Sequence, residues 1–297
     1  MTDKNKLQFK TSEKFWNSPK FIKTGDIKLA YYEKGEGPVV LLLHGLGGAA
    51  INFKRNIDVL AKKYRVIALD LPSFGRSDVP DVTKISPDDA SYTLFTKYVK
   101  EFVDKLNITR LTLVGHSMGG GISLDFSLKY PDLVDNLVLV SSAGLGNQVS
   151  VINIIGHTKL VNTKLSQLSL KDELIEKSTH FVSVNSNLLD EDQILSYKHW
   201  RLKDHVTELM NVLSPNFLSV KGQKIVYTNR LKELRMPVLI IWGINDRILP
   251  VRHARKTYER IPQSELFIFE RCGHVPILER YQEFNTALLG FLCKNYK

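Results

Sequence analysis

One serine of this 297-residue chain stands in a setting that favours a catalytic nucleophile. Ser117 is the centre of a Gly-His-Ser-Met-Gly run at 115–119, which follows the apolar residues 111–114 and precedes a helical pattern over 118–130. A sharp turn from strand to helix exposes its central side chain but brings the flanking backbone close together, which favours glycine on both sides. Such a turn holds the central residue at positive φ, a strain of about 1–3 kcal/mol that is seldom kept without a use. The start of the following helix would also stabilise negative charge beside Ser117.

Chance and a dinucleotide-binding loop account for this run less well than a nucleophile does. Short patterns of common residues arise by chance, but Gly115 and Gly119 come here with a strand before them and a helix after them. A dinucleotide-binding loop would require glycine where Ser117 stands and an acidic residue at the end of the next strand. Ser141 and Ser142 follow that strand instead. We therefore expect Ser117 to act as a nucleophile.

An acid and a base follow Ser117 along the chain. Asp246 lies four residues after Trp242, in the loop that leaves a predicted strand, and His274 follows another predicted strand at 266–269. A carboxylate can hold an imidazole in one tautomer, and the imidazole can take the serine proton and return it. The alternative for Asp246 is a plain turn residue, because Ile-Asn-Asp is good turn chemistry. The order Ser, Asp, His favours a catalytic triad.

The remaining histidines and the two cysteines indicate neither a metal nor a cofactor. No HExxH or similar ligand spacing occurs among the histidines outside these segments, which are His157, His180, His199, His205 and His253. Cys272 and Cys293 are too few for a disulfide framework and lack a CxxC spacing. Both are predicted to be buried thiols, with a chemical role for Cys272 as the weaker alternative. We expect no metal and no cofactor.

Composition and charge restrict the cellular context and the partners. The chain is 43% hydrophobic and 24% charged, which is ordinary for a globular protein. Its formal charge of +10 comes from scattered basic residues without a nucleic-acid motif, so nucleic-acid binding is not expected. Residues 1–20 form a polar, lysine-rich segment without the apolar core of a signal peptide, and no later run is long enough to span a membrane. These features predict a cytoplasmic protein.

Strand-like runs alternate with helical patterns along most of the chain, which predicts an α/β fold with a mostly parallel sheet. Helical spacing is clear at 51–63 and 92–106. The predicted strands are 21–24, 27–33, 39–43, 64–69, 111–114, 137–140, 238–242 and 266–269.

A long stretch without a core strand interrupts this alternation. Its helical patterns lie at about 170–182 and 190–213. This length is too great for a plain connection. We expect a helical cap at 145–234, inserted into a core made of 21–144 and 235–297, with a separate domain as the alternative.

Five segments together resemble the α/β-hydrolase fold family. They are His44-Gly45-Leu46-Gly47-Gly48, Asp70 to Ser77, the run at 115–119, Trp242 to Asp246, and Cys272-Gly273-His274. The resemblance covers residue 21 to the end. It implies an eight-stranded sheet with an antiparallel second strand, a Ser-Asp-His triad and a cap after the sixth strand.

The resemblance also suggests how the oxyanion is held. The backbone N–H groups of Met118, by its position in the turn, and of Leu46, by resemblance, would form the oxyanion hole. His44 and His116 are also candidates for substrate binding, since His44 is expected to order its turn and His116 to shape the pocket wall.

Side chains of the predicted cap could line an apolar pocket, although aromatic residues at helical spacing more often serve only packing. The candidates in the cap are Phe181, Trp200, Phe217 and Leu218. Of these we expect Trp200 at the substrate, together with Val275 beside His274.

The implied reaction is acyl transfer to water through an acyl-enzyme, on carboxylic esters of small to medium apolar substrates. The alternative is a carbon-carbon bond hydrolase that acts on ring-fission ketones from aromatic degradation. The chain departs from those relatives by carrying Val275 where they usually carry tryptophan, and a shorter glycine run after His44. Haloperoxidase relatives share the triad, and a non-catalytic ligand sensor on the same fold is a second alternative. A monomer and a homodimer both stay open.

Overall fold

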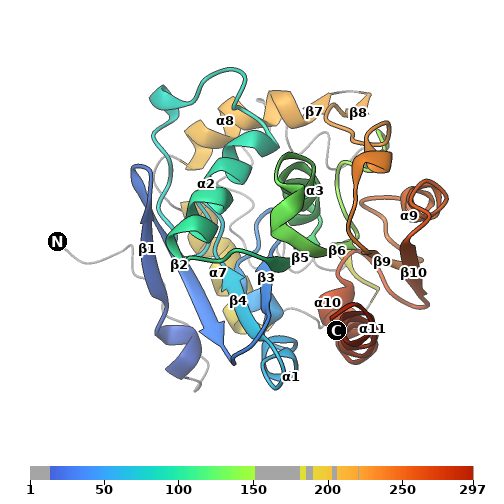
Figure 1. Cartoon of the computed structure of the whole chain (residues 1–297). Helices are drawn as coiled ribbons and strands as arrows, with labels where there is room; N and C mark the ends of the chain where they lie inside the picture. Colours follow the sequence, from blue (N-terminus) through green and yellow to red (C-terminus); the bar gives the residue numbers. More distant parts are fainter. Residues whose placement is uncertain (1–13, 151–180, 185–189, 203–205, 220, 297) are drawn as a thin grey trace.

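The computed structural model describes residues 14–150, 181–184, 190–202, 206–219 and 221–296. Eight strands form one sheet in the order β1-β2-β4-β3-β5-β6-β9-β10 (Figure 1). Their bounds are β1 Lys20–Thr24, β2 Ile27–Lys34, β3 Val39–Leu43, β4 Arg65–Leu69, β5 Leu111–His116, β6 Val134–Val140, β9 Val238–Gly243 and β10 Ser264–Phe269. β2 pairs antiparallel with β1 and with β4, and the other pairs are parallel. The expected eight-stranded α/β fold with an antiparallel second strand is confirmed.

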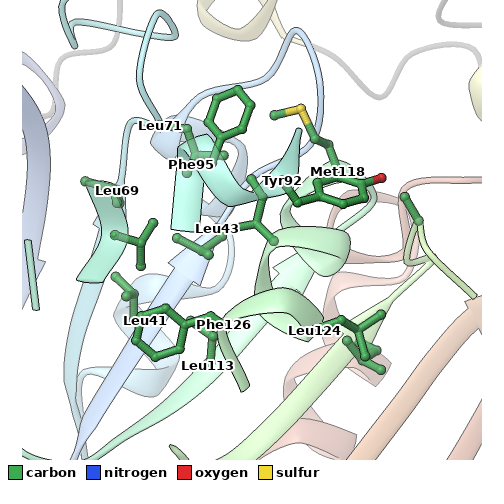
Figure 2. Packing of buried hydrophobic residues seen from close by; sticks show 14 of the residues in the cluster. Leu41, Leu43, Leu69, Leu71, Tyr92, Phe95, Leu113, Met118, Leu124 and Phe126 are labelled. Atoms are coloured by element: carbon green, nitrogen blue, oxygen red, sulfur yellow. The ribbon is translucent and has the colours of Figure 1, made fainter. Parts of the chain in front are cut away.

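Helices cover both faces of the sheet because its central strands are apolar on both sides. In β3, Leu41 and Leu43 belong to one hydrophobic cluster, while Val40 and Leu42 belong to another. The first cluster includes residues of α2 (Tyr92–Lys105) and α3 (Met118–Lys129), as Figure 2 shows for Phe95 and Phe126 against the strand leucines. The second includes residues of α1 (Ile57–Leu60), α10 (Pro276–Glu279) and α11 (Tyr281–Asn295). This alternation fixes which side of each strand faces which helical layer.

The remaining described elements are short or belong to the inserted stretch. They are the 3-10 turns Lys14–Asn17, Ala50–Phe53, Val82–Lys84, Pro131–Leu133 and Leu231–Glu233, the helices α7 Glu191–Leu202, α8 Val206–Phe217 and α9 Arg252–Tyr258, and the strands β7 Leu218–Ser219 and β8 Gly222–Gln223. α7 and α8 lie between β6 and β9 in the sequence, as an inserted cap requires. The bounds 145–234 for that cap, and those of the two core segments, stay predictions.

One helix expected from the sequence is divided in the structure. The expected helix at 51–63 consists of the turn Ala50–Phe53 and the single turn α1. Between them the buried Asn56 uses its side-chain amide to donate to Asn285 Oδ1 at 2.9 Å and to the Ile277 carbonyl at 3.3 Å. Within the expected helix at 190–213 the structure describes α7 and most of α8, and residues 203–205 between them lie outside the described part. Of the expected helix at 170–182, all but the last two residues lie outside the described part.

Part of the polar leading segment packs on the core. Trp16 is 1% exposed and its ring lies 4.9 Å from that of Tyr32. Arg76 donates to the Trp16 carbonyl at 2.7 Å and also bonds the Tyr32 hydroxyl. Residues 14–17 therefore belong to the folded unit, and residues 1–13 lie outside the described part.

The two cysteines differ in burial. Cys272 is buried, as expected, and burial raises the pKa of its thiol well above the usual range. Cys293 is exposed on α11, so the prediction that both are buried was wrong for this residue. Free cysteine is usually buried, but that tendency of the residue type does not reveal which side of a helix it occupies.

Among the helices of the described residues, none is both long enough and apolar enough to cross a membrane.

Candidate active site

Ser117 occupies a strained turn between β5, which ends at His116, and α3, which begins at Met118. Its φ is 53° and its ψ is −115°, a backbone conformation that costs a non-glycine residue about 1–3 kcal/mol. The positive φ expected from the sequence is therefore present. The Ser117 N–H donates to the Val140 carbonyl at 2.9 Å, and its carbonyl accepts from Gly120, Gly121 and Ala143. These bonds hold the turn in place against its strain.

The glycines of the turn are required by close backbone contacts. A Cβ at Gly115 would lie 2.3 Å from the Gly119 carbonyl oxygen and 2.4 Å from Ser123 Oγ. A Cβ at Gly119 would lie 2.3 Å from the Leu43 carbonyl oxygen. The strand and the helix can approach this closely only because both positions lack a side chain.

We expect Gly115→Ala to lower the free energy of unfolding by about 3 kcal/mol, because the added methyl overlaps backbone atoms that cannot move away. Gly290 on α11 is the matched control, since a Cβ there meets nothing within 4 Å. Gly290→Ala should stabilise the helix by up to about 1 kcal/mol. Urea denaturation of the two variants measures both effects, and a Gly115→Ala variant as stable as the parent would contradict the close packing of the turn.

His274 lies between the hydroxyl of Ser117 and the carboxylate of Asp246. Ser117 Oγ donates to His274 Nε2 at 2.9 Å, and His274 Nδ1 donates to Asp246 Oδ2 at 2.8 Å. The side chain of Asp246 is fully buried and that of His274 is 8% exposed. The structure thus brings together the three residues that the sequence analysis singled out as nucleophile, acid and base.

Asp246 is held by the loop that follows β9. Its second oxygen, Oδ1, accepts the backbone N–H groups of Ile248 at 2.8 Å and Leu249 at 2.9 Å. Trp242 in β9 closes the same loop by donating its indole N–H to the Leu249 carbonyl at 2.9 Å. The carboxylate therefore has one oxygen for the loop and one oxygen for His274.

Leu46 and Met118, whose backbone amides are the predicted oxyanion hole, lie at the same pocket as Ser117. The loop that carries Leu46 is ordered by His44, which is completely buried. His44 Nε2 accepts the Leu71 N–H at 3.0 Å, so the proton is on Nδ1, which donates to the Gly45 carbonyl at 2.8 Å. That bond orients the peptide group between Gly45 and Leu46, which includes the Leu46 N–H.

Burial keeps two further histidines neutral near the site. It lowers the pKa of His44 to about 4 and that of His116 to about 3. His116 Nε2 donates to the backbone carbonyl of His274 at 2.8 Å. Both side chains therefore serve as fixed hydrogen-bond partners, and neither is placed to accept the serine proton.

A mostly apolar pocket opens at Ser117. It encloses about 710 Å³, including the part that is open to solvent. α2 contributes Tyr92 and Phe95, and α8 contributes Met210, Leu213 and Phe217. The other described lining residues are Leu46, Phe74, Ser117, Met118, Ala143, Val149, Ser214, Leu218, Gln223, Ile248 and Leu249. None of these described side chains carries a positive charge.

The four expected substrate-binding residues do not line this pocket in the described part of the chain. His44 and His116 bond to backbone groups. Trp200 stacks on Phe74 with ring centroids 5.2 Å apart, one layer behind the wall. Val275 packs against the second hydrophobic cluster. A direct role of these residues at the substrate stays a prediction.

Sequence reasoning missed most of the pocket wall. Of the cap candidates, Phe217 and Leu218 do line the pocket, whereas Phe181 packs against the first hydrophobic cluster. Tyr92 and Met210 carry no signal in the sequence that distinguishes them from ordinary core residues.

Within the described residues there is no group of three or more His, Cys, Asp or Glu side chains that could hold a metal ion.

Several known proteins are similar to this chain in sequence and in fold. A family model described as alpha/beta hydrolase fold matches residues 38–281. A 2-hydroxy-6-oxononadienedioate/2-hydroxy-6-oxononatrienedioate hydrolase of Comamonas testosteroni is 32% identical over 269 residues, which are 88% of this chain and 90% of that protein. A 2-hydroxy-6-oxo-6-phenylhexa-2,4-dienoate hydrolase of Burkholderia cepacia is 30% identical over 88% of this chain and 90% of its own.

A solved structure extends the likeness to a phospholipase. A membrane phospholipase A, described as a bacterial virulence factor, superposes with a TM-score of 0.78 at 26% identity. The match covers 94% of this chain and 86% of that one. Proteins that are similar to this chain therefore include dienoate and dienedioate hydrolases and a phospholipase A.

Proposed function

Because this chain belongs to the alpha/beta hydrolase fold family, we propose that it is a serine hydrolase in which Ser117, His274 and Asp246 act as the triad. The observation that carries the proposal is the pair of hydrogen bonds that join His274 to Ser117, at 2.9 Å, and to Asp246, at 2.8 Å, beside an apolar pocket that Ser117 lines. No resident metal or cofactor is needed for this chemistry.

The reaction follows from the placement of these groups. Ser117 Oγ attacks the substrate carbonyl while His274 Nε2 takes its proton, and the carbonyl oxygen becomes an oxyanion between the N–H groups of Leu46 and Met118. His274 then gives the proton to the leaving group as the acyl-enzyme forms. Water, deprotonated by His274, attacks the acyl-enzyme, and the proton returns to Ser117. Asp246 keeps the imidazole in the tautomer that accepts at Nε2.

For the substrate, carbon-carbon bond hydrolysis of ring-fission ketones ranks first. This reverses the order suggested by the sequence, because the relatives from Comamonas testosteroni and Burkholderia cepacia bear names of such hydrolases at 32% and 30% identity. The leaving group would then be a carbon atom, which His274 must protonate. The described pocket wall suits the apolar substituent of such a ketone.

Ester hydrolysis is the second candidate, and one observation favours it. A ring-fission dienoate carries a carboxylate, but no described lining residue carries a positive charge to pair with it. The likeness to a phospholipase structure at 26% identity points the same way. A neutral acyl chain would fit against Phe95, Met210 and Phe217 without an unpaired charge.

A substrate panel separates the two candidates. We expect kcat/KM for a dienoate with a phenyl ketone to exceed that for an aryl ester of similar size by at least about tenfold, which is about 1.4 kcal/mol of transition-state binding. The loss of dienone absorbance and the release of phenol measure the two reactions. The reverse ranking would make the chain an esterase and leave the triad in place.

A further inference from the structure

A buried carboxylate lies beside the loop that carries His274. Glu279, the last residue of α10, is 8% exposed. Its Oε2 accepts the N–H of Gly273 at 2.9 Å, and its Oε1 accepts the N–H of Val275 at 3.2 Å. One side chain thus bonds the amides on both sides of His274.

The same carboxylate reaches the inserted stretch. Oε2 of Glu279 also accepts the N–H of Val184 at 2.9 Å. Next to it, the N–H of His274 donates to the Val182 carbonyl at 2.7 Å. Residues 182–184 therefore lie directly against the His274 loop, and Glu279 bonds both segments.

The contact is close because Gly273 has no side chain. A Cβ there would lie 2.7 Å from the Val182 carbonyl oxygen, 2.9 Å from Ser183 Cα and 3.0 Å from Glu279 Oε1. The backbone of the inserted stretch thus occupies the space that a larger residue would need. The carboxylate of Glu279 lies between the backbone of the His274 loop and that of residues 182–184, and it bonds both.

The bonds of Glu279 go to backbone donors rather than to a cation. Within the described residues no ion pair of Glu279 is formed, and the neighbouring Arg280 pairs with Glu283 instead. A buried carboxylate needs compensating donors, and three N–H groups supply charge-assisted bonds that are stronger than neutral ones. A neutral side chain could not replace all three.

We propose that Glu279 is a positioning residue that fixes the His274 loop against residues 182–184 and so sets the place of the imidazole between Ser117 and Asp246. The proposal rests on the proposed role of His274 as the base. His116 adds a further bond to this loop, because its Nε2 donates to the His274 carbonyl at 2.8 Å. The N–H groups of Gly273, His274 and Val275 and the carbonyl of His274 are then all bonded.

Glu279→Gln tests this role with almost no change in volume. The amide keeps one acceptor oxygen but turns an NH2 group toward a backbone N–H, so the loop must shift. We expect kcat to fall about 10- to 100-fold with KM within about threefold, because small displacements of a catalytic group are costly. Glu283→Gln is the matched control, since it loses only a surface ion pair with Arg280 and should leave kcat within about twofold.

Amide hydrogen exchange gives a readout that does not depend on turnover. In the parent protein the amides of Gly273, Val275 and Val184 should be strongly protected, and in Glu279→Gln these three should exchange faster while β5 and β6 do not change. Rapid exchange of the three amides in the parent would overturn the proposal even if the variant fails to fold.

The remaining outcomes are equally decisive. An unchanged kcat in folded Glu279→Gln, or a loss of kcat that comes with faster exchange throughout the core, would also overturn the proposal. If instead Ser117→Ala keeps its activity, the triad assignment fails, and the exchange data still report whether Glu279 holds the loop.

Discussion

Ser117→Ala is expected to reduce kcat by about a million-fold while the fold remains intact, because removal of the nucleophile from a serine triad has an effect of that size. The variant loses the hydroxyl that bonds His274 Nε2 at 2.9 Å. The backbone bonds that hold the turn do not involve this hydroxyl. Alanine should even tolerate the φ of 53° about as well as serine does.

The measurement combines turnover with labelling by a fluorophosphonate. The parent should be labelled stoichiometrically, and Ser117→Ala should not be labelled. Ser127→Ala, in the helix α3 that follows Ser117, is the control, since Ser127 is buried and its hydroxyl has no partner among the described residues. It should keep full labelling and full turnover.

Two results would count against the assignment. Turnover by Ser117→Ala at the parental rate would remove Ser117 as the nucleophile. A parent protein that binds ligands of the panel but turns over none of them would favour the non-catalytic sensor instead.

The fold could be predicted because the apolar patterns of the strands and helices agree with the way these elements are buried. The run at 39–43 is apolar at every position, which a strand buried on both faces requires, and its residues do divide between two clusters. Residues 92–106 show the 3.6-residue spacing of a helix with one apolar face, and α2 ends within one residue of the predicted end. The break in the expected helix at 51–63 was not predicted, because the bonds of Asn56 at this break join residues more than two hundred positions apart.

The pocket could not be predicted to the same degree. Helical spacing shows that one side of a helix is buried but not what it is buried against, so Trp200 and Phe217 look alike in the sequence. Trp200 stacks behind the wall on Phe74, while Phe217 faces the pocket and touches Tyr92 with ring centroids 4.7 Å apart. Glu279 was missed for a related reason, because its three partners are backbone N–H groups that no residue type reveals.

The loop around Asp246 makes a specific outcome expected for Asp246→Asn. Oδ1 of Asp246 accepts two backbone N–H groups, from Ile248 at 2.8 Å and Leu249 at 2.9 Å. In the variant these donors require the amide oxygen at the same place, so the NH2 group must face His274 Nδ1. An NH2 group donates a hydrogen bond and cannot accept one from Nδ1–H. His274 Nδ1 must therefore become the acceptor, which places the imidazole proton on Nε2.

In that tautomer Nε2 can no longer accept the proton of Ser117, so we expect kcat to fall about ten-thousand-fold. Thermal unfolding should change little, because both loop bonds survive, and this separates a wrong tautomer from a damaged fold. Asp135→Asn, which loses a surface pair with Arg110, should keep kcat within about twofold. If Asp246→Asn retained more than about one tenth of the parental kcat, another group would have to orient His274, since the carboxylate that now does so would be gone.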